Sequence, residues 1–239
     1  MTVAALDNEL RIVAMEACDL EQCLATINRL DARVVAVDAP QSPNQGLMLR
    51  PDVRLRFNLT PRAKTWGNWK LCEYELRRRN IRIYNTASSV AASQRWMQHG
   101  FMIYEQLKAV GFGMFRAGLP LQERTCVEVH PHACFAALLH RRPLPKNSLE
   151  GRLQRQLVLY VEGIDLPYPL TVVEEITRHH LLQGHLPLNG LYTHDQLDAL
   201  VAAYTAYLVA VKPRRISQLG DPEEGFITLP AAELEDHYP

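Results

Sequence analysis

The first thirty residues alternate between two hydrophobic periods. Short β-rich runs at 2–6 and 10–16 are separated by a polar turn, and this arrangement predicts a β-hairpin. Apolar residues between 19 and 30 then recur at helical spacing, so one face of a helix is expected there. Asp19 precedes this helix and is placed to cap its first turn.

A wholly apolar strand is predicted next, over 33–38. It ends at Asp38 and stops before Pro40, which cannot continue a central strand. An apolar strand that follows a helix favours burial on both faces, as in an α/β sheet covered by helices. Residues 39–70 have no clear period and are rich in proline and glycine, which is typical of a functional segment inside a compact domain.

The rest of the chain reads mainly as helices. Helical spacing predicts segments at 69–79, 90–110, 132–140, 149–161, 171–183 and 194–210. Thr193 and Gln196 form a capping box at the start of the last helix. A strand at 124–130 ends at Pro131, and 226–229 predicts a last short strand.

Length and composition fit one domain that spans 1–239. The hydrophobic fraction is 47%, and no apolar run approaches the roughly 20 residues of a membrane span. The first residues lack the features of a signal peptide, so we expect a cytoplasmic protein without a membrane partner. The five cysteines are odd in number and form no CxxC, which favours reduced thiols over disulfides or a zinc site.

Charge is neutral in total but uneven along the chain. Ten basic and only three acidic residues lie between Arg50 and Arg82. Such a patch predicts contacts with phosphate groups of nucleic acid. The alternative for part of the run, around Glu75 to Arg79, is a solvated helix face. The residues we predict to bind substrate are Arg50, Arg54, Arg56, Arg62 and Lys64.

Two acidic residues belong to strands that should be buried. Asp38 ends its strand, and ligands of open α/β sheets bind beyond the carboxyl ends of strands. Glu128 lies within its strand, with Val127 and Val129 on the opposite face, and a buried carboxylate needs a cation, a metal or a proton. Structural ion pairs are the alternative for both, with Arg124 or an arginine of the basic segment as the partner of Glu128.

A third acid lies on an apolar helix face. Asp198 is one turn inside its helix, where the positions three, four and seven residues later are Val201, Ala202 and Thr205. Asp195 lies in the first turn, where a negative charge complements the helix dipole, and a metal-binding role is the lesser alternative. The pair His130 and His132 is a weak metal signal, although His130 shares a strand face with Glu128.

Oxygen ligands from separate elements suit Mg²⁺ or Mn²⁺ rather than zinc. Such ions activate water and stabilise the leaving oxygen of a phosphodiester. We therefore predict that Asp38, Glu128 and Asp198 are catalytic and metal-binding, in a nuclease. No glycine-rich phosphate loop is present, which argues against a phosphotransferase.

Several segments occur in an order that resembles a known family. They are 34–40 (VVAVDAP), 72–81 (CEYELRRRNI), 127–131 (VEVHP), 198–206 (DALVAAYTA) and 220–230 (GDPEEGFITLP). Together they look like the family called domain of unknown function 429, which are predicted nucleases with an RNase H-like fold. The resemblance implies a mixed sheet flanked by helices, with an insertion at about 39–122, and it places the family's acids on Asp38, Glu128 and Asp198. Glu224 matches the C-terminal motif.

The resemblance also implies a departure. RNase H-like enzymes begin with a strand that carries a catalytic Asp, whereas this chain begins at what would be the second strand, 2–6. Either the natural start lies upstream of Met1, or the chain lacks one metal ligand. In the second case activity is reduced, and a non-catalytic module that binds nucleic acid or a protein is the alternative function. A missing strand also leaves a sheet edge open, which favours a homodimer.

Overall fold

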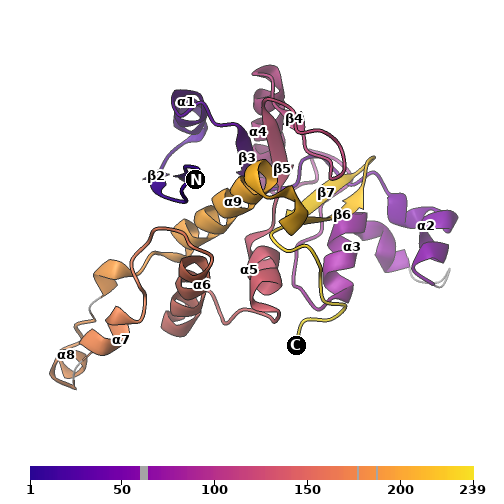
Figure 1. The fold of residues 1–239 in the computed structure, drawn as a ribbon. Coiled ribbons are helices and arrows are strands. Elements are labelled where there is room, and N and C mark those ends of the chain that lie inside the picture. The colour runs from indigo at the N-terminus through magenta and orange to yellow at the C-terminus, as the bar shows by residue number, and fades with distance from the viewer. Residues whose placement is uncertain (60–63, 177, 187) are drawn as a thin grey trace.

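The computed structural model describes residues 1–59, 64–176, 178–186 and 188–239 (Figure 1). Its strands are β1 (Thr2–Leu6), β2 (Ile12–Ala17), β3 (Val34–Val37), β4 (Gly113–Met114), β5 (Thr125–Glu128), β6 (Ser217–Asp221) and β7 (Gly225–Leu229). Its α-helices are α1 (Leu20–Arg29), α2 (Pro51–Arg56), α3 (Leu71–Arg78), α4 (Arg95–Ala109), α5 (Pro131–Leu139), α6 (Leu149–Val161), α7 (Thr171–Glu175), α8 (Arg178–Leu182) and α9 (His194–Val211). Short 3₁₀ turns lie at Leu47–Leu49, Lys64–Asn68, Leu188–Gly190 and Pro213–Arg215.

A five-stranded mixed sheet forms the centre of the molecule. Its order is β3-β5-β7-β6, and β4 pairs with the start of β5 on the side where β7 pairs with its end. The contacts of β5 with β3, β4 and β7 are parallel, whereas β6 and β7 form an antiparallel hairpin. The mixed α/β class predicted from the sequence is therefore confirmed.

Helices cover both faces of this sheet, and side-chain alternation decides which residue meets which helix. Val35 and Val37 pack with Cys126 against α1 and α4. Val34 and Ala36 point the other way, into the larger core built mainly by α5, α6 and α9. This period of two also sets the faces of the acidic residues discussed below.

The N-terminal hairpin forms a sheet of its own. β1 and β2 pair antiparallel, as predicted, and neither pairs with the five-stranded sheet within the described part of the chain. Both β1 and β3 pack on α9 (Figure 1). Val34, Val35 and Ala36 are consequently only partly buried, so the prediction that both faces of this strand are buried was too strong.

Local signals explain where two of the helices begin. The Asp19 side chain accepts a hydrogen bond from the Gln22 backbone N–H at 2.9 Å, which confirms the cap predicted for α1. At α9, the Gln196 side chain accepts the Thr193 N–H at 2.9 Å, and the Thr193 hydroxyl accepts the Gln196 N–H at 3.3 Å. The predicted capping box is thus confirmed, and it fixes the start of the helix that carries Asp198.

A buried carboxylate fastens the segment that follows β3. Glu224, in the turn between β6 and β7, is 1% exposed. Its carboxylate accepts three backbone hydrogen bonds, from Gln45 and Leu47 at 3.0 Å and from Leu71 at 2.9 Å. One side chain therefore ties residues 45–47 and the start of α3 to the sheet.

The structure divides one predicted helix and adds the strand β6. The segment 171–183 forms two short helices, α7 and α8, rather than one. β6 was not predicted because its glycine and polar residues have low strand propensity, and its antiparallel pairing with β7 stabilises the strand instead.

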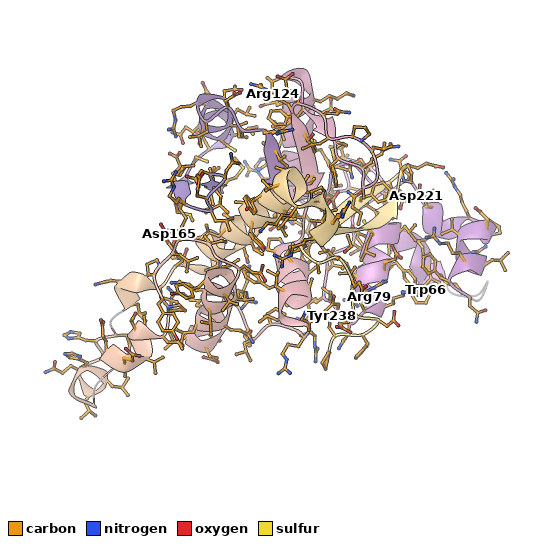
Figure 2. All side chains as sticks on the ribbon, viewed as in Figure 1. Trp66, Arg79, Arg124, Asp165, Asp221 and Tyr238 are labelled. Atoms are coloured by element: carbon orange, nitrogen blue, oxygen red, sulfur yellow. The ribbon has the colours of Figure 1, made fainter. Side chains whose placement is uncertain are left out.

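The C-terminal tail lies beside α3, where the Tyr238 N–H donates to the Arg79 carbonyl at 3.0 Å (Figure 2). Within the described residues, every helix is too short or too polar to cross a membrane.

Candidate functional site

The carboxyl ends of β3 and β5 bring the first candidate residues together. Asp38 directly follows β3, and its side chain is 48% exposed. His130 follows β5 and caps the start of α5, with a side chain that is only 13% exposed. Because β3 and β5 are parallel neighbours, these ends lie at one edge of the sheet, and His130 Nδ1 is 3.9 Å from Asp38 Oδ1.

Asp198 approaches this edge from α9. It is mostly buried, and Lys146 Nζ lies 3.5 Å from its Oδ2. Burial raises the pKa of Asp198, Lys146 lowers it, and the nearby negative charge of Asp38 raises it further. Burial raises the pKa of the Cys134 thiol to about 12, and the negative charges of Asp38 and Asp198 add to this increase. Asp38 and Asp198 therefore share the face of the sheet that α5 and α9 cover.

Glu128 lies on the other face. Its partner in the ladder is Val37, which packs toward α4, whereas Val127 and Val129 belong to the core under α5 and α9. The carboxylate is 1% exposed, accepts the Gln41 N–H at 3.0 Å and lies 3.9 Å from Lys70 Nζ. Strand alternation thus turns Glu128 to the face opposite that of Asp38 and Asp198, although Glu128 and Asp38, after burial, both raise the pKa of Tyr84 and so lie near the same edge.

Lys70 is the buried cation in this part of the core. It is fully buried, and Glu128, Glu73 and Glu224 all act on it. Burial would lower the pKa of Lys70, but the carboxylates, with Glu128 first, raise it, so the lysine stays charged. Burial likewise raises the pKa of Glu128, and Lys70 opposes this shift. The ion-pair alternative considered for Glu128 is what the structure contains, with Lys70 in place of an arginine.

A second group of basic residues surrounds the Asp38 and Asp198 region. Their effect is visible at His132, whose pKa burial lowers to about 4. The positive charges that lower this pKa further belong to His130, Arg155, Arg82 and Lys146. Arg155 is buried against Phe135 and donates to the Leu144 and Gly151 carbonyls. Arg82 is exposed, and Lys146 is half exposed although it pairs with Asp198, so both side chains can reach an anionic ligand at this edge.

The predicted substrate-binding residues lie elsewhere. Arg50 forms an ion pair with Glu223 at 2.5 Å, and Arg54 and Arg56 belong to α2. Figure 1 shows α2 beyond β6 and α3, at the far side of the sheet from the start of α9. Arg62 lies outside the described residues, as does the side chain of Lys64. Arg50, Arg54 and Arg56 are therefore not beside Asp38 and Asp198, whereas Arg82, the last residue of the basic stretch, lies near them through the contact of its carbonyl with His130.

The described side chains do not by themselves form a complete metal-binding site. Asp195 is 67% exposed, and its Oδ1 lies 2.9 Å from His194 Nδ1. Across the part of the chain that is described, no three His, Cys, Asp or Glu side chains converge as a ready metal site. A surface depression of about 520 Å³ lies instead near the opposite end of β3, between Arg33, Leu119 and Arg214.

The sequence predicted one site with three acids, of which Asp38 and Asp198 lie on one face in the structure. His130 carried a usable signal, because it and Asp38 both follow neighbouring strands. Lys146 had none, since it comes from the loop before α6 and reaches Asp198 only through the tertiary fold. The separation of Glu128 depended on the register of β3 against β5, which a single sequence does not reveal.

The fold and this edge define a mixed α/β protein with a polar site at the carboxyl ends of its parallel strands. The family model described as "Protein of unknown function (DUF429)" matches residues 1–224, so the chain belongs to this family. Neither the curated proteins nor the solved structures include a match to the chain.

Proposed function

We propose that this protein is a cytoplasmic, divalent-metal-dependent nuclease of RNase H-like fold, which hydrolyses phosphodiester bonds at the edge formed by Asp38 and Asp198. The observation that supports it most is the convergence of these two carboxylates, from β3 and α9, on one face. Burial raises the pKa of Asp198, the negative charge of Asp38 raises it further, and a cation bound to both carboxylates would relieve this repulsion. The five free thiols agree with a reducing compartment.

The donor set suits Mg²⁺ or Mn²⁺. These ions often use one or two protein carboxylates and complete their coordination with water and substrate phosphates, so a three-residue cluster is not required. Asp38 is half exposed, which leaves an oxygen accessible, whereas Asp198 is mostly buried and pairs with Lys146. When bound, such an ion activates water and stabilises the leaving oxygen.

Other residues take supporting parts in this proposal. Lys146 and Arg82 contact phosphate oxygens, in place of the more distant Arg54 and Arg56. Glu128 holds the turn after Asp38, because it binds the Gln41 N–H while Lys70 balances its charge. Glu128 is then a positioning residue rather than a metal ligand.

The test is cleavage of RNA and DNA by the purified chain with Mn²⁺ or Mg²⁺. We expect Asp38→Asn and Asp198→Asn each to lose activity by about 10²-fold or more, because each removes charge from the metal. Asp31→Asn is the matched control, since Asp31 lies just before β3, at the other end of the strand that Asp38 follows, and pairs with Arg124 at the surface.

Equal residual cleavage by wild type and both variants indicates a contaminant and removes the proposal. Salt-sensitive RNA binding without cleavage or metal binding supports the alternative, a non-catalytic module that binds nucleic acid.

We also propose a homodimer through the open edge of β3. The Arg33 and Val37 carbonyls accept from β5 at 3.0 Å, so the backbone groups of Val34 and Ala36 point away from it, and β5 is the only strand that β3 pairs with in the described chain. The strand is apolar and carries none of the charges or prolines that protect edges. Sedimentation should show a dimer that Val34→Pro weakens, and a monomer at all concentrations contradicts this.

A further inference from the structure

The ring of His130 is held in one orientation. Its Nε2 lies 3.1 Å from the Arg82 carbonyl oxygen. A carbonyl only accepts hydrogen bonds, so Nε2 carries the hydrogen and Nδ1 has the lone pair whenever the ring is neutral. Tyr84 contacts the ring edge-on, with centroids 5.6 Å apart, and the backbone of His130 is fixed as the cap residue of α5.

The free nitrogen faces a carboxylate. Nδ1 is buried and has no hydrogen-bond partner among the described residues. Its nearest acidic atom is Asp38 Oδ1, at 3.9 Å. A lone pair and a carboxylate oxygen at this distance repel unless a positive charge lies between them, and that charge is either a proton or a metal ion.

We propose that His130 Nδ1 and Asp38 Oδ1 bind the same divalent cation, and that this nitrogen makes the site prefer Mn²⁺ to Mg²⁺. The inference rests on the proposed metal dependence and deepens it, because it names a ligand and a metal preference that the acids alone do not give. Mg²⁺ takes oxygen ligands almost exclusively, whereas transition-metal ions accept imidazole.

The surroundings of the ring fit this arrangement, and a small movement of Asp38 completes it. Neighbouring ligands of an octahedral ion with bonds of about 2.1 Å lie roughly 3.0 Å apart, so the half-exposed Asp38 side chain, now 3.9 Å from Nδ1, moves by about 1 Å when both atoms bind one ion. Metal-binding histidines usually donate their second ring N–H to a carbonyl or carboxylate. The Arg82 carbonyl does this for His130.

Pulsed electron paramagnetic resonance of Mn²⁺ bound to the full chain tests the assignment. We expect ¹⁴N modulation from a bound histidine in the wild type and its loss in His130→Ala. In the same variant the Kd for Mn²⁺ should rise about tenfold or more, whereas the Kd for Mg²⁺ should change far less. His132→Gln is the matched control, since its ring centroid is 6.3 Å from that of His130, and it should keep the modulation. Wild-type protein labelled with ¹⁵N-histidine gives the same answer without a substitution.

Each outcome separates this inference from the nuclease proposal. Bound Mn²⁺ without nitrogen modulation overturns the role of His130, even if RNA is cleaved. Nitrogen modulation without cleavage keeps the site and removes the nuclease. Absence of Mn²⁺ binding overturns the inference.

Discussion

Glu224 offers the sharpest test of how the segment after β3 is fixed. In Glu224→Gln, the amide oxygen can still accept from Gln45 and Leu47, but the amide nitrogen then faces the Leu71 N–H, where two donors meet. An unsatisfied buried donor costs about 1–3 kcal/mol, and each remaining bond loses about 1 kcal/mol when its acceptor is no longer charged. Removing a buried carboxylate offsets part of this cost.

The expected net loss is about 2–4 kcal/mol of unfolding free energy. Urea denaturation followed by circular dichroism measures it, as a lower midpoint with an unchanged slope. Glu223→Gln is the control, because this neighbouring residue is exposed and pairs with Arg50 on the surface, where such a pair contributes little.

Equal midpoints for the two variants would refute the reasoning. The three backbone hydrogen bonds would then contribute nothing to stability, and residues 45–47 would be held by the packing of Leu47 and by local contacts such as the Gly46 N–H bond to the Asn44 side chain.

Two further predictions concern the candidate site. The His132 pKa of about 4 lies below the usual unfolded value, so the unfolded chain binds the extra proton between about pH 6.5 and 4. Stability should therefore fall as pH drops through this window, by about 3 kcal/mol at most, and His132→Gln should flatten the slope measured by urea titration at several pH values. Lys146→Met should weaken RNA binding several-fold in fluorescence anisotropy at low salt, whereas Arg54→Met should not, and the reverse result would return phosphate binding to α2.

Local signals were enough to predict much of the fold. The hairpin, α1, β3, β5 and α9 follow from hydrophobic period, proline stops and side-chain caps, which act within a few residues. β6 escaped prediction because Ser217–Asp221 becomes a strand only through pairing with β7. The open edges of β1 and β3 likewise depend on which strands pair.

The candidate site was predictable only in part. Asp38 and Asp198 lie on the face expected from their neighbours, since Val34 and Ala36 share a core with α9. Glu128 was grouped with them, but strand alternation directs it toward Lys70, 58 residues earlier in the chain. Contacts of this kind depend on tertiary packing, and a single sequence contains no periodic signal for them.

A double-mutant comparison of Mn²⁺-dependent RNA cleavage tests the central claim most directly. If Asp38 and Asp198 hold one ion, each single asparagine variant removes most of the activity, and the double variant is little worse than either one. Independent, additive losses, or activity in all three variants equal to that of the wild type, would contradict a shared catalytic site.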